Sequence, residues 1–172
     1  MSISTKLGSN YEAIRSAARL KTIHVLLNDI TFDLQVRVPV KREMEVLTAA
    51  ITDPDVQRVN AIYETLSAPL IKTLDEAELG FIDALNADSD KIKVTDNDLI
   101  VDGNSVRLLA KMTVIWQMQV EKYFSLLVSA TGEPITESFE EIAEEFPEAI
   151  IKEIVSKIDE AIRPSYKEAK KN

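Results

Sequence analysis

Cysteine is absent from this chain of 172 residues, and histidine and glycine are scarce, with one and four residues respectively. The missing cysteine excludes thiol nucleophiles and thiolate metal sites, and any histidine-based triad would have to use His24 alone. The glycines are too far apart to form a phosphate-binding loop; they are Gly8, Gly80, Gly103 and Gly132. We therefore expect a protein that acts by binding other proteins, with no catalytic, metal or cofactor site.

The charge of the chain is acidic and unevenly distributed. A net charge of −9 and a pI of about 4.7 argue against nucleic acid or an anionic membrane as the main partner. Residues 1–50 carry a net charge of +2 and residues 51–172 carry −11, so the two parts would attract each other between subunits. The sequence contains neither an apolar run long enough to span a membrane nor an N-terminal signal segment, and we expect a cytoplasmic protein.

The apolar pattern predicts a mainly α-helical fold with a small N-terminal β-hairpin. Alternating apolar residues predict two strands within residues 21–38, joined by a turn at Asn28-Asp29. Helical spacing predicts helices over about 39–51, 53–66, 69–80, 105–128, 137–146 and 147–163, with Thr136 as the cap of the fifth. Residues 91–102 show a weaker pattern for a second short hairpin. We expect a single mostly helical domain at 1–164 and a flexible polar tail at 165–172.

The strongest helical signal covers residues 105–128. A stripe of large apolar side chains is expected to form the core, and it consists of Leu109, Met112, Trp116, Val120, Tyr123 and Leu127. Leu108, Ile115 and Met118 form a second stripe beside it. A helix that is apolar on so much of its circumference must be covered on more than one side. It is therefore either the central core helix or a helix that also contacts a neighbouring subunit.

Two surfaces are candidates for binding a partner or another subunit. The first is the apolar stripe of the last helix, which contains Ile151, Ile154, Val155, Ile158 and Ile162. Packing of this stripe onto the domain core is the alternative explanation. The second is a glutamate cluster that includes Glu140 and Glu144, in which like charges four residues apart repel each other. A basic partner would relieve this repulsion, and a solvated helix face is the alternative.

Two other polar features have ordinary structural explanations. His24 lies in a predicted strand without neighbouring histidine or cysteine, so we expect a strand residue and not a metal ligand. An acidic turn contains Asp96, Asp98 and Asp102. A calcium loop that begins at Asp96 would need an oxygen ligand and a glycine where Ile100 and Val101 stand. We expect a solvated acidic turn.

Three segments follow one another in a distinctive order. A hairpin strand runs directly into a helix (ITFDLQVRVPVKREMEVL), a long apolar helix contains the tryptophan (SVRLLAKMTVIWQMQVEKYF), and an acidic amphipathic helix starts at a proline (EEFPEAIIKEI). This layout covers most of the chain and resembles the tail assembly chaperones of lambda-like phages with long non-contractile tails.

The resemblance implies a function in the cytoplasm of an infected host. Such chaperones coat or solubilise the hydrophobic tape measure protein before the tail tube polymerises around it, form homo-oligomers, and are absent from the finished virion. A longer form, made by ribosomal frameshifting, recruits the tail tube protein. Two alternatives stay open: a tail completion or head–tail connector protein that is retained in the virion, and an enzyme that uses only carboxylates.

The resemblance also suggests a slip site at the end of this reading frame. The adjacent Lys170 and Lys171 codons can be written as A-AAA-AAG, on which tRNAs can re-pair after slipping back one base. Our hypothesis is that a minor product continues past Asn172 in the −1 frame. A solvated polar terminus would explain the same lysines.

Overall fold

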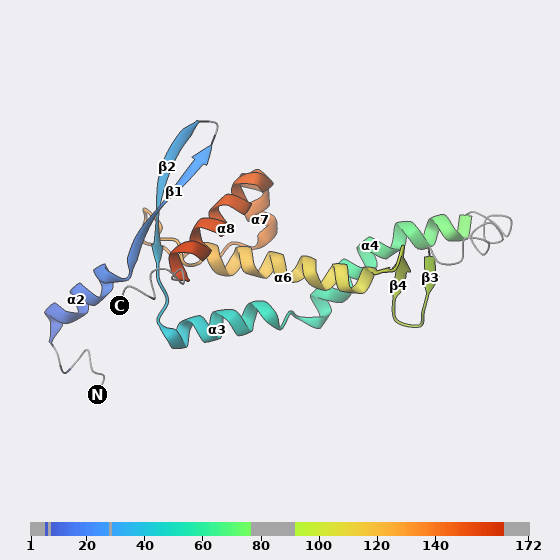
Figure 1. The fold of residues 1–172 in the computed structure, drawn as a ribbon, viewed down its shortest axis with the longest axis horizontal. Coiled ribbons are helices and arrows are strands. Elements are labelled where there is room, and N and C mark those ends of the chain that lie inside the picture. The colour runs from blue at the N-terminus through green and yellow to red at the C-terminus, as the bar shows by residue number, and fades with distance from the viewer. Residues whose placement is uncertain (1–5, 7, 28, 77–91, 164–172) are drawn as a thin grey trace. The chain divides into compact units, whose positions relative to one another are not determined.

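The structure is a computed structural model that describes residues 6, 8–27, 29–76 and 92–163. The elements, in chain order, are α2 (Ser9–Ala18), β1 (Leu20–Leu27), β2 (Ile30–Arg37), α3 (Lys41–Thr52), α4 (Val56–Glu76), β3 (Ile92–Val94), β4 (Leu99–Val101), β5 (Asn104–Ser105), α6 (Val106–Phe124), α7 (Phe139–Glu145) and α8 (Glu148–Ile162) (Figure 1). The predicted mainly helical fold with an N-terminal hairpin is confirmed. The weaker pattern at 91–102 forms the β3–β4 hairpin, to which β5 adds a third strand. The predicted tail at 165–172 lies outside the described residues.

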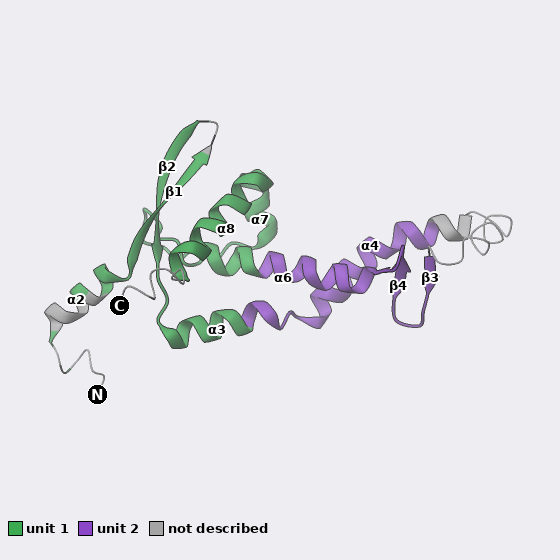
Figure 2. Cartoon of the chain, viewed as in Figure 1, with its two compact units in different colours: residues 1–49, 119–172 green, residues 50–118 purple. Residues whose placement is uncertain are grey.

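The chain divides into two compact units (Figure 2). Unit 1 contains residues 1–49 and 119–172, and unit 2 contains residues 50–118. Both α3 and α6 contribute residues to each unit. The single domain expected at 1–164 stays a prediction.

The framework of unit 1 is the antiparallel β1–β2 hairpin. Its register places Ile23 opposite Leu34 and Val25 opposite Phe32. Because side chains alternate between the two faces of a strand, Ile23, Val25 and Val36 are buried on the same face, as their spacing predicts. The apolar face of the hairpin therefore has to be covered by another element, and α8 packs against β1.

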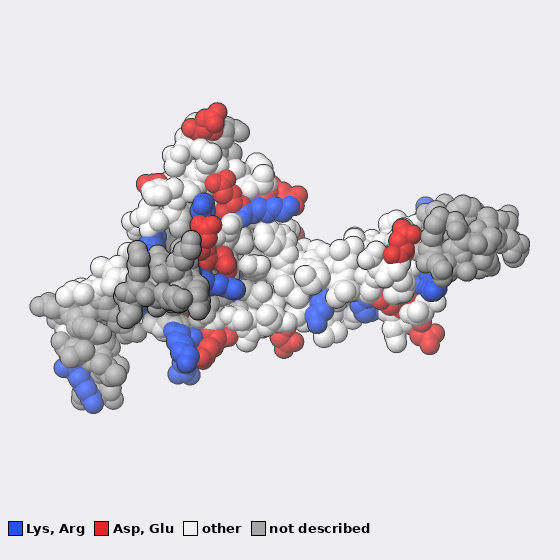
Figure 3. All heavy atoms as spheres, in the orientation of Figure 1, with Lys and Arg blue, Asp and Glu red and all other residues white. Residues whose placement is uncertain are grey.

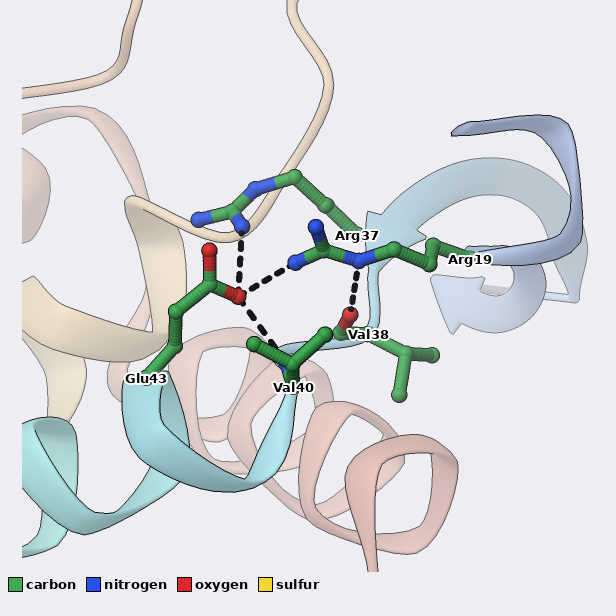
Figure 4. A network of polar contacts seen from close by, with 5 residues as sticks. All are labelled: Arg19, Arg37, Val38, Val40 and Glu43. Carbon is green, nitrogen blue, oxygen red and sulfur yellow. Dashed lines mark hydrogen bonds and ion pairs between the residues drawn. The ribbon is translucent and has the colours of Figure 1, made fainter. Parts of the chain in front are cut away.

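A polar cluster around Glu43 joins the two ends of the hairpin to the start of α3 (Figure 4). The Glu43 carboxylate accepts hydrogen bonds from the Val40 backbone N–H at 2.9 Å and from Arg37 at 3.2 Å, and it also pairs with Arg19. Arg19 Nε donates to the Val38 carbonyl at 2.9 Å. Burial disfavours ionisation of Glu43, but the Val40 hydrogen bond and the charges of Arg19 and Arg37 outweigh it and lower the pKa of the carboxyl.

The core of unit 2 forms where α4 packs against the first part of α6. Val59 of α4 lies against Ala110 and Val114 of α6, and all three are buried. Larger side chains surround this contact, namely Ile62, Tyr63, Leu66 and Met118. The face of α6 that carries Ala110 and Val114 is therefore the buried one in unit 2.

Asp98 fixes the start of α6. Its carboxylate accepts hydrogen bonds from the backbone N–H groups of Leu99 at 2.8 Å and Arg107 at 2.9 Å, and from the Ser105 hydroxyl at 2.5 Å. The Arg107 guanidinium lies 4.2 Å from the centre of the Tyr63 ring, a cation–π contact with α4. We expected a solvated acidic turn at this position. Instead, the Asp98 carboxylate connects β4, β5 and the start of α6 within unit 2.

Candidate partner-binding surfaces

The apolar stripe of α8 is part of the core of unit 1 and is not a free surface. All five of its predicted partner-binding residues are buried: Ile151, Ile154, Val155, Ile158 and Ile162. Polar contacts fix the helix on the hairpin, with Lys21 donating to the Ala161 carbonyl at 2.8 Å and the Leu26 N–H donating to Glu153 at 3.0 Å. The expectation of a partner surface on this stripe is thus corrected, because the apolar face of the hairpin already covers it.

The glutamate cluster lies on α7, whose cap differs from the predicted one. Ser138 and Glu141 form a reciprocal capping box, so Thr136 is not the cap. Hydrogen bonding to Ser138 lowers the pKa of the Glu141 carboxyl. Glu140 and Glu144, the two predicted partner-binding glutamates, are exposed.

The core residues predicted in α6 and just after it divide into three groups. Val120 and Tyr123 are fully buried, and Trp116 and Leu127 are partly buried. Leu109 and Met112 are instead 56% and 55% exposed, so their expected place in the core is wrong. The reason is that α4 packs on the small side chains of the same helix, which leaves the large ones outside.

The exposed side chains of α6 line an apolar groove, which we call the unit 2 groove. Its volume is about 590 Å³, and it is lined by Leu66, Leu70, Val101, Asn104, Ser105, Val106, Leu108, Leu109 and Met112. None of these side chains is ionisable. On the face drawn in Figure 3, the described surface of residues 50–118 is mostly uncharged. Such a groove would accept an apolar segment of a protein, and the flexible Met112 side chain would adapt to different shapes.

A second groove, which we call the unit 1 groove, lies between β2, α7 and the loop after α6. Its volume is about 370 Å³. Its apolar lining includes Phe32, Leu34, Ile135 and Phe146, and Glu137, Glu141 and Glu145 also line it. This groove therefore differs from the unit 2 groove, because three negatively charged carboxylates lie beside its apolar surface.

His24 and the acidic side chains of the described residues have structural surroundings that can be stated one by one. His24 lies opposite Asp33 in the hairpin and contacts its carboxylate at 2.5 Å, with both side chains mostly exposed. Within residues 8–27, 29–76 and 92–163, no three His, Cys, Asp or Glu side chains are placed to hold a metal ion. No helix in these ranges is both long and apolar enough to cross a membrane.

No protein family, no curated protein sequence and no solved structure matches this chain. Its function is therefore argued from the two grooves and their chemistry. The sequence contained a partial signal for the unit 2 groove, since helix 105–128 has more apolar circumference than one packing partner can cover. It contained no signal for the unit 1 groove, which is assembled from three separate segments.

Proposed function

We propose that this protein is a phage tail assembly chaperone, which binds apolar segments of the tape measure protein and keeps them soluble until the tail tube forms. The observation that carries the proposal is the unit 2 groove. Three of its large side chains, Leu108, Leu109 and Met112, are each more than half exposed, although they lie next to a well-packed helix contact. We assign this class of chaperone because the order of the hairpin, the long apolar helix and the acidic last helix resembles that of tail assembly chaperones.

The strength of such binding fits a transient complex. Full burial of a Leu or Met side chain contributes about 1.5–3 kcal/mol, so these three half-exposed side chains would contribute about 3 kcal/mol together. Ordering of the partner and of the groove opposes part of this gain. Each contact would therefore be weak, and a long partner would be held by several chaperone copies and released when tube protein replaces them.

The charge of the protein suits the same role. Residues 51–172 carry a net charge of −11, which would give a complex with an apolar partner a strongly charged surface. Like-charged particles repel one another, and this repulsion opposes precipitation. In our proposal the protein acts in the host cytoplasm, self-associates, and contacts the tail tube protein through a frameshifted extension.

Co-expression with the tape measure protein of the same phage tests the proposal. We expect the tape measure protein to be soluble with the natural chain and to precipitate with a Leu109→Asp variant, because a carboxylate would enter the apolar groove. Val56→Asp is the matched control, since Val56 is 70% exposed in the same unit but does not line the groove. Equal solubility with both variants, or none with the natural chain, would contradict the proposal.

Analysis of purified virions separates this function from its main alternative. A chaperone should be missing from mature particles. A tail completion or head–tail connector protein would be present there in a fixed number of copies.

A further inference from the structure

The carboxylates of the unit 1 groove belong to a long stretch of the chain without positive charge. Residues 123–151 contain seven glutamates and no lysine or arginine. Three of these glutamates, Glu137, Glu141 and Glu145, line the groove beside its apolar side chains. An occupant that satisfies both features must be apolar on one side and positively charged beside it.

The N-terminal segment of the chain has this character. Residues 1–22 contain four basic side chains and one acidic one. Arg19 and Lys21 are held within unit 1 by Val38 and Ala161, and Lys6 and Arg15 are the other two.

The sequence of helix α2 contains an apolar stripe beside this charge. Within it, Tyr11, Ile14 and Ala18 follow at helical spacing. Every α2 side chain whose exposure the structure describes is exposed, and Ile14 is 66% exposed. Ile14 therefore has apolar surface that the described residues leave uncovered, and no described α2 residue lines the groove of its own chain.

We propose that α2 of one copy docks in the unit 1 groove of a second copy. Ile14 would enter the apolar part of the groove, and Arg15 would lie near the carboxylates of Glu137 and Glu145. The Arg19–Glu43 pair would hold the base of the docked helix on its own unit. Reciprocal docking closes a dimer, whereas one-way docking builds a longer series of subunits. The inference is independent of the tape measure protein, because the two grooves lie in different units.

Analytical ultracentrifugation of the purified full chain at low and high salt tests the proposal. We expect the natural chain to associate, and salt to weaken the association because it screens the charges at the groove rim. Arg15→Glu and Glu145→Arg should each raise the dissociation constant about five- to tenfold, since each turns an attraction into a repulsion. An equal mixture of the two variants should associate more tightly than either alone, because in a mixed pair both docked helices face a groove residue of opposite charge.

Matched controls separate this docking from general charge effects. Lys41→Glu and Glu64→Arg change the net charge by the same amounts at exposed positions outside α2 and the groove, and should leave association unchanged. Ile14→Asp should abolish association, whereas Ile30→Asp, at a comparably exposed position of the hairpin, should not.

Three results would overturn the proposal. The first is a natural chain that stays monomeric at every accessible concentration, which would also be the outcome if α2 docked within its own chain. The second is an Ile14→Asp variant that associates like the natural chain. The third is a mixture of the charge-reversed variants that associates no better than either alone. None of these results bears on tape measure binding through the unit 2 groove, although the first would also contradict the self-association in the proposed function.

Discussion

Replacement of Ile158 by alanine should strongly destabilise unit 1. Ile158 is fully buried in α8, which packs against β1. The change removes three carbon atoms, which costs about 2.4 kcal/mol at about 0.8 kcal/mol per methylene. The cavity left behind adds to this cost, so we expect a loss of about 3–4 kcal/mol in the free energy of unfolding, within the range for large-to-small core changes. For a chain of this size the midpoint of thermal unfolding should fall by about 6–16 °C.

Urea unfolding followed by circular dichroism, repeated over a range of protein concentrations, measures this loss. Ile158→Val removes one methyl group and should cost about 0.5–1.5 kcal/mol. Val46→Ala is the control, because Val46 is 65% exposed on α3, and it should change stability by no more than about 0.5 kcal/mol. A loss below about 1 kcal/mol for Ile158→Ala would refute the buried stripe. A loss that depends on protein concentration would show that the stripe is a subunit interface.

Four further predictions follow from polar groups and from the chain end. The pKa of Glu43 is lowered in the folded protein, so its stabilising contribution is present above the unfolded-state pKa and is lost as the pH falls through the folded-state pKa. Acid titration of stability should therefore be flatter for Glu43→Gln than for the natural chain. Tyr123→Phe removes the hydroxyl that donates to Asp159 at 2.5 Å and should cost about 1–3 kcal/mol in urea unfolding. Burial, followed by the hydrogen bond to the Asp159 carboxylate, raises the pKa of Tyr123, so its phenol should ionise at a higher pH in the folded protein than after unfolding in a spectrophotometric titration. If Lys170-Lys171 is a slip site, mass spectrometry of infected cells should find a longer product with the same N-terminus, and AAG-AAG codons would exclude it.

Local periodicity was sufficient to predict the hairpin. Phe32, Leu34 and Val36 alternate with polar residues, and alternation directly reports a strand with one buried face. The apolar stripe of α8 was also visible, but its partner was not. Periodicity shows which face of a helix is apolar and does not show whether a strand of the same chain or a second protein covers it.

The buried face of α6 could not be predicted from hydrophobicity alone. The large side chains Leu109 and Met112 suggested one face, whereas α4 packs on Ala110 and Val114. Small residues contribute little to an apolar stripe, yet they determine how closely two helices approach. The choice of face is thus a property of the helix pair, and it leaves the large side chains in the unit 2 groove.

The polar clusters that connect separate elements were the features least predictable from the sequence. The Glu43 cluster includes Arg19, which lies 24 residues away, whereas the partners of Asp98 lie within nine residues of it; neither cluster has a sequence motif. The α7 cap is different, because the capping-box spacing from Ser138 to Glu141 is present in the sequence, and the prediction of Thr136 as the cap is wrong. The unit 1 groove could not be predicted from the sequence either, since its lining comes from three separate segments.

Photo-crosslinking in infected cells tests the central claim most directly. A photoreactive amino acid in place of Met112 would sit in the unit 2 groove, and one in place of Val56 would sit on exposed surface of the same unit outside it. We expect position 112 to form an adduct with the tape measure protein before tails are complete, position 56 to form none, and mature virions to lack the adduct. Absence of an adduct between position 112 and the tape measure protein, an adduct that remains in mature virions, or equal labelling from both positions would contradict this expectation.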